Sequence, residues 1–120
     1  MQVAICTADT DERYELSRLV DDAMLRRGLL PEMLLFRSPT ELLEASADGK
    51  AVFDLVFLMN IHNAPSLRNL CRRATVILVG SKGDGPTAFD IGADYFIESP
   101  VMQKELNNAL TRCLPLKKNG

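Results

Sequence analysis

The sequence predicts an α/β domain in which helices cover both faces of one parallel β-sheet. Apolar runs of strand length, such as residues 53–59 and 75–79, alternate with segments whose apolar residues recur at helical spacing. The runs are nearly continuous and do not alternate with polar residues, as expected for strands that are buried on both faces.

Residues 2–28 predict the first strand and the first helix. Gln2–Cys6 is an apolar run of strand length. Asp9 is suited to cap the free amides of a following helix, and Glu12, three positions later, completes a capping-box pattern. The predicted inner face of this helix consists of Leu16, Leu19, Val20 and Ala23, and Gly28 is expected to end it.

The same order repeats over residues 33–59. Met33–Phe36 predicts the second strand. Ser38 and Glu41 form a second capping box around Pro39, which suits the first helical position, and Gly49 is expected to close this helix. The third strand is expected to end at Met59.

The remaining elements are shorter. Residues 67–71 predict a short third helix, and residues 75–79 the fourth strand. Residues 81–86 are rich in turn formers and predict a mobile loop, followed by a brief fourth helix that Gly92 ends. Residues 95–97 predict the fifth strand. Ser99 is expected to cap the last helix, with Pro100 at its first position.

Five strands that alternate with five helices imply parallel pairing through right-handed crossovers. The expected topology is therefore a doubly wound sheet with the flavodoxin-like strand order 2-1-3-4-5. One domain is expected over residues 1–114, with residues 115–120 as a tail or the start of a linker.

Composition argues against several classes of function. The net charge of -2 gives no reason to expect direct nucleic-acid binding, and no apolar run approaches the roughly 20 residues that span a bilayer. The N-terminus has no signal-peptide pattern, so a cytoplasmic location is expected.

The three cysteines, Cys6, Cys71 and Cys113, lie far apart and do not form a zinc pattern with His62, the only histidine. We expect reduced, apolar thiols, no cofactor, no metal site and no enzymatic activity.

Several segments, taken in order, resemble the receiver domain of bacterial response regulators. Residues 3–6 resemble the first receiver strand, residues 54–58 the strand that leads to the phosphorylated aspartate, and residues 88–96 the Gly-Ala-x-x-Tyr stretch. Pro100 resembles the proline of the Lys-Pro pair, which implies a cis peptide bond after Ser99. The Ile5–Cys6 strand end and the Ala88–Phe89 pair are similar to receivers that carry LytTR-type DNA-binding outputs. The resemblance implies a role in two-component signalling or transcription control.

The residues that perform phosphoryl chemistry in receivers are replaced in this chain. In the family an acidic pair binds magnesium, an aspartate accepts the phosphoryl group, and a hydroxyl residue, an aromatic residue and a lysine respond to it. The corresponding positions here are Thr7 and Ala8 (acidic pair), Met59 (acceptor), Gly80 (hydroxyl), Phe96 (aromatic) and Ser99 (lysine). Magnesium needs hard oxygen ligands, and a thioether has no oxygen that could attack phosphorus. The sequence therefore predicts a pseudo-receiver whose site is filled with uncharged atoms.

Some positions allow two interpretations. Asp9 is either the cap of the first helix, which we favour, or a surviving magnesium ligand. Met59 either packs into the space left by the lost acids or borders a pocket for a small molecule. Arg68, Arg72 and Arg73 are either a solvated helix end or a patch for an acidic partner. His62 is expected to be an ordinary loop residue and not an alternative phosphorylation site.

The favoured function is regulation through protein–protein contact, as a homodimer or with a partner, without phosphorylation. The resemblance implies a contact surface over the fourth helix, the fifth strand and the last helix, formed by Asp90, Tyr95, Ile97, Val101, Met102 and Glu105. A DNA-binding output domain is expected to follow in a longer protein. The alternatives are a small-molecule sensor that uses the degenerate pocket, and a phosphoryl-transfer domain with an unusual acceptor.

Overall fold

The computed structural model describes residues 1–47, 52–59 and 67–114. The strands are β1 (Gln2–Cys6), β2 (Glu32–Phe36), β3 (Leu55–Met59), β4 (Thr75–Gly80) and β5 (Tyr95–Glu98). The helices are α1 (Thr10–Arg26), α2 (Pro39–Ala47), α3 (Leu67–Arg73), α4 (Gly85–Ile91) and α5 (Gln103–Cys113), and a short 3-10 helix, η1 (Lys82–Asp84), precedes α4. Strands and helices thus alternate as predicted, and α3 and α4 are short.

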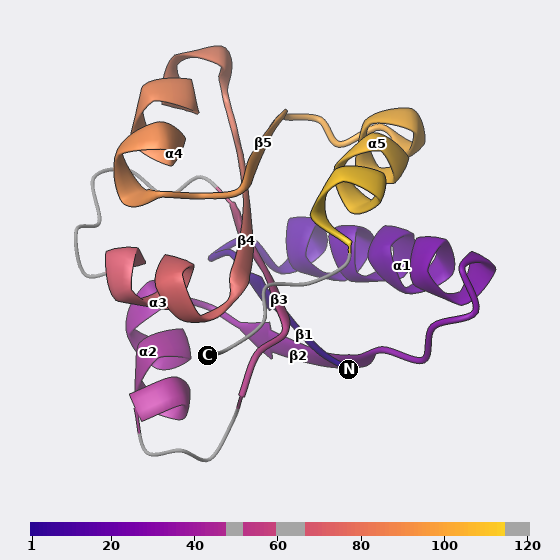
Figure 1. The fold of residues 1–120 in the computed structure, drawn as a ribbon, viewed down its shortest axis with the longest axis horizontal. Helices are drawn as coiled ribbons and strands as arrows, with labels where there is room; N and C mark the ends of the chain where they lie inside the picture. Colours follow the sequence, from indigo (N-terminus) through magenta and orange to yellow (C-terminus); the bar gives the residue numbers. More distant parts are fainter. Residues whose placement is uncertain (48–51, 60–66, 115–120) are drawn as a thin grey trace.

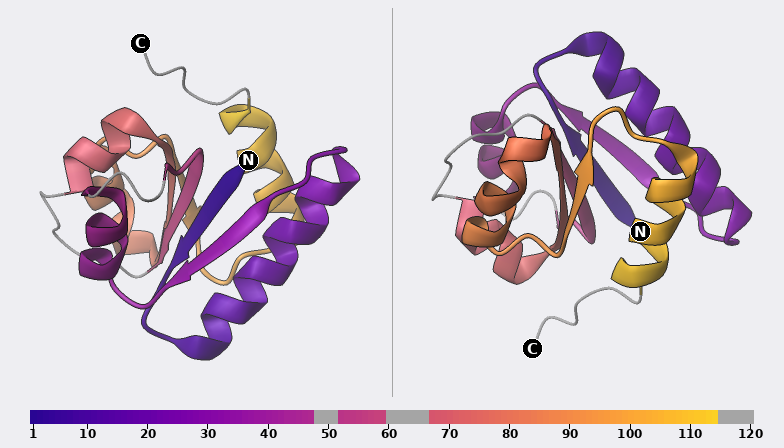
Figure 2. Two further views of the ribbon diagram at one scale, coloured as in Figure 1. Left: turned by 90° about the horizontal axis from the view of Figure 1, so that it is seen from below. Right: turned by 90° about the horizontal axis from the view of Figure 1, so that it is seen from above.

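The sheet is entirely parallel and has the strand order β2-β1-β3-β4-β5, which confirms the predicted topology. Helices α1 and α5 cover one face, and α2, α3 and α4 cover the other (Figures 1 and 2). Within the described ranges, none of the helices has the length and apolarity needed to cross a bilayer.

The core lies in two layers on either side of the sheet. Residues that alternate along the central strands face opposite layers: Phe57 and Ile77 pack toward α1 and α5, whereas Val56 and Leu78 pack toward α2, α3 and α4. All residues of β3 and β4 are buried. This burial on both faces explains why these two strands read as continuous apolar runs.

Local capping signals in the sequence define several helix ends. Oδ1 of Asp9 accepts the amide of Glu12 at 2.9 Å, which confirms Asp9 as the cap of α1. Ser38 Oγ accepts a hydrogen bond from the amide of Glu41 at 3.2 Å, which is one half of the predicted capping box. The other half differs from the prediction, because the Glu41 carboxylate accepts from the amide of Arg37, at 3.4 Å. Gly92 has φ +80° and ends α4 as predicted, since L side chains rarely adopt this conformation. Gly49 lies outside the described residues.

The predicted start of the last helix is wrong. Helix α5 begins at Gln103, with Met102 as its N-cap, and not at Ser99–Pro100. The reason is that the Ser99 amide donates to the carbonyl of Gly80 at 2.8 Å, so Ser99 still extends the pairing of β5 with β4. The Ser99–Pro100 peptide is cis, as the resemblance implied.

The segment of residues 81–86 is not the loop that its turn-forming composition predicts. It forms η1 and the first residues of α4. A capping box between Ser81, the N-cap, and Asp84 stabilises the start of η1. Pro86 lies in the first turn of α4, where its missing amide hydrogen is not needed.

Candidate functional site

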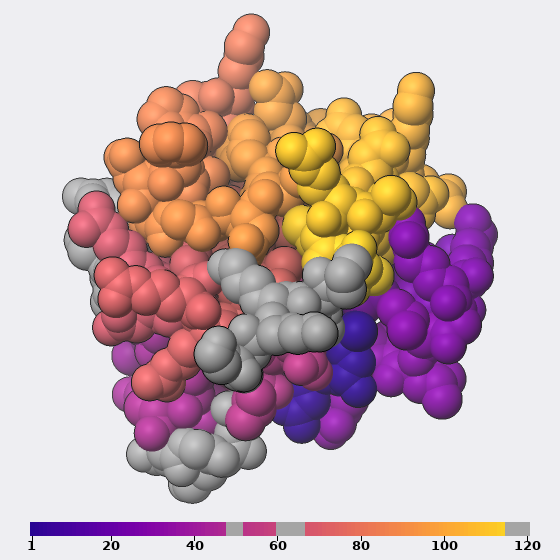
Figure 3. All heavy atoms as spheres, viewed as in Figure 1, coloured from indigo at the N-terminus to yellow at the C-terminus, as the bar shows by residue number. Residues whose placement is uncertain are grey.

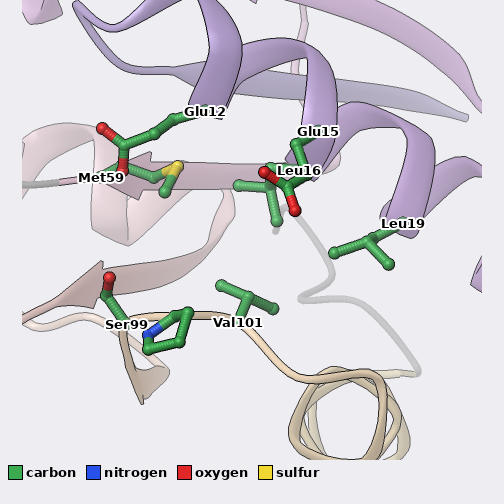
Figure 4. Close-up of a pocket in the computed structure, with 8 residues that line it drawn as sticks. Glu12, Glu15, Leu16, Leu19, Met59, Ser99 and Val101 are labelled. Carbon is green, nitrogen blue, oxygen red and sulfur yellow. The ribbon is translucent and has the colours of Figure 1, made fainter.

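The carboxyl edge of the sheet carries the positions that the resemblance would assign to the phosphorylation site of receivers. Thr7 and Ala8 follow β1, Met59 ends β3, Gly80 ends β4, and Ser99 follows β5. A cavity of about 120 Å³ lies at this edge (Figure 4). It is lined by Glu12, Glu15, Leu16, Leu19, Met59, Ser99, Pro100 and Val101. Of the predicted site positions, the structure therefore brings Met59 and Ser99 to one cavity.

Met59 is 6% exposed and packs in the core layer that also contains Leu16 of α1. Its thioether thus lies in a mostly apolar environment at the end of β3. This packing is what the first interpretation of Met59 expects, and its place in the cavity lining is what the second expects, so both interpretations stay open.

The site is not filled with uncharged atoms alone, so that part of the sequence prediction is wrong. Glu12 and Glu15 extend from α1 toward the cavity (Figure 4). Side chains on a helix tilt toward its N-terminus, which brings residues of the first turns of α1 over the sheet edge. Because no lysine or arginine lines the cavity among the described residues, its charged groups are carboxylates.

Arg13 is a site residue that the sequence analysis did not identify. Its side chain is buried, and Nη1 donates to the carbonyl of Thr7 at 2.7 Å while Nη2 donates to Oγ1 of Thr10 at 3.3 Å. The Thr7 amide donates to the carbonyl of Phe36 at 3.1 Å. Arg13 therefore fixes the chain where β1 ends. The spacing of Arg13 from Leu16 and Val20 is the sequence signal that could have placed it on the inner face of α1. Its charge conceals this signal, because arginine side chains are rarely buried.

Gly80 lies against Asp84, which the sequence analysis also did not identify. Asp84 is 7% exposed, and its Oδ2 accepts both the amide of Ser81 at 2.8 Å and the hydroxyl of Ser81 at 3.1 Å. A Cβ atom on Gly80 would collide with this oxygen. A carboxylate therefore takes the space that the receiver hydroxyl residue would need.

The remaining predicted positions serve structural roles or lie outside the cavity. Ala8 and Asp9 are exposed, and the Asp9 carboxylate caps α1. Phe96 is partly buried and packs against the layer that contains α3 and α4. Among the residues that the structure describes, no group of three or more acidic, histidine or cysteine side chains could hold a metal ion.

The three cysteines are buried. The pKa of the Cys6 thiol is raised to about 12, mainly by burial and to a smaller extent by the Glu41 carboxylate, while the Arg13 guanidinium acts in the opposite direction. Cys6 is therefore a neutral thiol over the physiological range. His62 lies outside the described residues.

The predicted contact surface is only partly exposed. Asp90, Met102 and Glu105 are exposed, and Tyr95 and Val101 are partly buried. Ile97 is 1% exposed and packs in the core with α1 and α5, so its assignment to a surface is wrong. The side-chain alternation along β5 turns Ile97 toward these helices.

No protein-family model matches the sequence, and no curated protein matches it. Solved structures do match the fold. A pilus assembly protein from Burkholderia thailandensis is 20% identical, with 93% of this chain and 96% of that chain covered and a TM-score of 0.75. A pilus assembly-related protein from Burkholderia pseudomallei is 20% identical, with 93% and 87% covered and a TM-score of 0.74. A response regulator receiver domain protein from Clostridium thermocellum is 17% identical, with 92% and 90% covered and a TM-score of 0.71. Together with the order β2-β1-β3-β4-β5, these neighbours show that the chain has the fold of a response-regulator receiver domain.

Proposed function

We propose that this chain is a receiver-like regulatory domain that acts through protein–protein contact and without phosphorylation at its sheet edge. The observation that carries the proposal is Met59, which stands at the acceptor position and is packed into the core. A thioether cannot form an acyl phosphate. The signal that this domain transmits would therefore be the presence of a partner or a second copy, and not a phosphoryl group.

The charges around the cavity support this proposal. A phosphoryl group bound there would face the carboxylates of Glu12 and Glu15, with no cationic side chain among the described lining residues. Like charges repel, although solvent weakens the effect of Glu15, which is exposed. An anion is therefore disfavoured where receivers bind one.

The size of the cavity favours contact over sensing. Its volume of about 120 Å³ is below the range of roughly 300–1,000 Å³ that is typical of small-molecule sites. A thermal-shift screen of metabolites tests the sensor alternative. Stabilisation that disappears in Val101→Phe, which would fill the cavity, would favour the sensor.

The proposed domain comprises residues 1–114, with residues 115–120 as a tail or a linker to an output domain. Its contact surface would include the exposed residues Asp90, Met102 and Glu105.

Two measurements test the proposed function. After incubation with acetyl phosphate and magnesium, intact-mass analysis should show no added phosphoryl group, whereas a receiver with its aspartate serves as the positive control. A phosphoryl group mapped to a residue near Met59 would contradict the proposal. Dimer formation measured by sedimentation, or binding of a partner, should weaken in Met102→Asp/Glu105→Lys, because the first change puts a charge on an exposed apolar contact residue and the second reverses a charge on the proposed surface.

A further inference from the structure

An open groove lies between α3 and α4, on the face of the sheet away from α1 and α5. The two helices are neighbours in Figures 1 and 3. The groove between them has a volume of about 340 Å³. Its floor contains the buried side chains of Cys71 and Ile91. Gly92, which ends α4 with φ +80°, also lines the groove. Its position and its volume distinguish it from the cavity beside Met59.

One wall of the groove exposes an aromatic ring. Phe89 of α4 is 86% exposed, more than any other large hydrophobic side chain in the described part of the chain. The inner face of α4 is formed by Ala88 and Ile91, so the ring of Phe89 makes no contribution to the core. A large aromatic side chain beside a groove is a common anchor of protein interfaces.

The opposite wall is basic. Arg68 and Arg72 are four residues apart on α3, so they share one side of the helix, and both are exposed. The Nε of Arg68 donates to the carbonyl of Asp90 at 3.3 Å, which holds its guanidinium over the end of α4. Within the described ranges, neither arginine forms an ion pair. Because both side chains are exposed, this wall presents positive charge to solvent although the chain as a whole has a net charge of -2.

We propose that the α3–α4 groove binds an acidic protein segment that carries an aromatic or aliphatic side chain. The apolar side chain would pack on Phe89, and carboxylates would pair with Arg68 and Arg72, which present planar donors suited to carboxylate. This inference rests on the proposed function, because it assigns the chemistry of a partner. A peptide is favoured over nucleic acid because the floor and Phe89 are apolar.

The experiment uses a phage-displayed library of random twelve-residue peptides, selected against the whole chain in low salt. The selected peptides should be enriched in Asp and Glu around an aromatic or aliphatic residue. The best peptide is then synthesised with a fluorescent label and titrated with variants. Binding should weaken at least tenfold in Phe89→Ser and in Arg68→Glu/Arg72→Glu, and it should weaken as salt is raised.

Two matched variants test whether the effect is local. Leu30 is also an exposed apolar residue, at 82%, and Arg73 is an exposed arginine of α3 that does not line the groove. Leu30→Ser and Arg73→Glu should each change the affinity less than threefold. Circular dichroism melting of each variant confirms that the fold is retained.

The inference is overturned if no acidic peptide is enriched, if a single-stranded DNA of twelve nucleotides binds more tightly than the best peptide, or if the groove variants bind like wild type. Peptides that lose binding in Met102→Asp/Glu105→Lys but not in the groove variants would overturn it and leave the proposed function intact. A concentration-dependent dimer that dissociates in the groove variants, with no peptide bound, would show that a second copy occupies the groove, and would also overturn it.

Discussion

The carboxylate of Asp84 occupies the space that a side chain at Gly80 would need. Its Oδ2 accepts the amide of Ser81 at 2.8 Å, and a Cβ atom on Gly80 would collide with the same oxygen. In receivers the corresponding position after the fourth strand holds the hydroxyl residue that responds to the phosphoryl group. In this chain the capping box of η1 fills the space beside Gly80, so the glycine and the aspartate depend on each other.

Replacing Gly80 by alanine should lower the free energy of unfolding by about 2 kcal/mol, because the Asp84 carboxylate must move. Asp84→Ala alone should cost about 1 kcal/mol through the lost cap. The double variant should be less destabilised than the sum, by about 1 kcal/mol, as measured by urea unfolding. Gly83→Ala is the control, since no atom lies within 4 Å of its Cβ position. Strict additivity would contradict the proposed coupling.

Met59→Asp should destabilise the fold and should not restore phosphorylation. The new carboxylate would replace a core side chain that is 6% exposed, and an unpaired buried charge costs about 3 kcal/mol. Met59→Leu keeps the volume and should cost less than about 1.5 kcal/mol. A Met59→Asp protein that melts like wild type and gains a phosphoryl group from acetyl phosphate would refute this expectation.

Arg13→Ala should destabilise the end of β1, because the buried carbonyl of Thr7 loses its 2.7 Å donor. An unsatisfied buried acceptor costs about 1–3 kcal/mol, and amide hydrogen exchange should speed up near Thr7. Arg18→Ala removes an exposed arginine from the same helix and should change stability by less than about 0.5 kcal/mol. Equal effects of the two substitutions would argue against the role of Arg13.

The stability of the protein should fall as pH rises from about 9 toward 12, in part through Cys6. The pKa of its thiol is about 12 in the folded protein and 9.0 for an unperturbed thiol. Between these two values the thiol is ionised in the unfolded chain but not in the folded protein, so rising pH favours the unfolded state. The slope from this group should approach about 1.4 kcal/mol per pH unit and should vanish below pH 9. Cys6→Ala should lack this contribution, whereas other titrating groups are common to both proteins. Parallel pH profiles of the two proteins in urea unfolding would contradict the high pKa.

Local and periodic signals predicted most of the fold. The strands β3 and β4 are buried on both faces, so their sequences are continuous apolar runs that needed no tertiary information. Asp9 and Gly92 act through hydrogen bonds and a backbone conformation within a few residues, and both were predicted correctly.

The errors arose where long-range contacts determine the structure. Ser99 is held in the sheet by the carbonyl of Gly80, a partner that local sequence does not specify. Strand β5 has only four residues, too few for alternation to indicate that Ile97 faces inward. Arg13 and Asp84 are buried although they are charged, because backbone groups satisfy them. The spacing of Ser81 and Asp84 is a capping-box pattern, which is the signal that could have identified Asp84.

The most direct test of the central claim is an NMR titration of the protein with magnesium and beryllofluoride, which mimics a phosphoryl group on aspartate. The ¹H–¹⁵N spectrum should remain unchanged at Thr7, Met59, Gly80 and Ser99, since the edge of the sheet offers no acceptor carboxylate at residue 59. Saturable shifts of these amides, dependent on both reagents together, would show that the edge still binds a phosphoryl mimic and would contradict the claim.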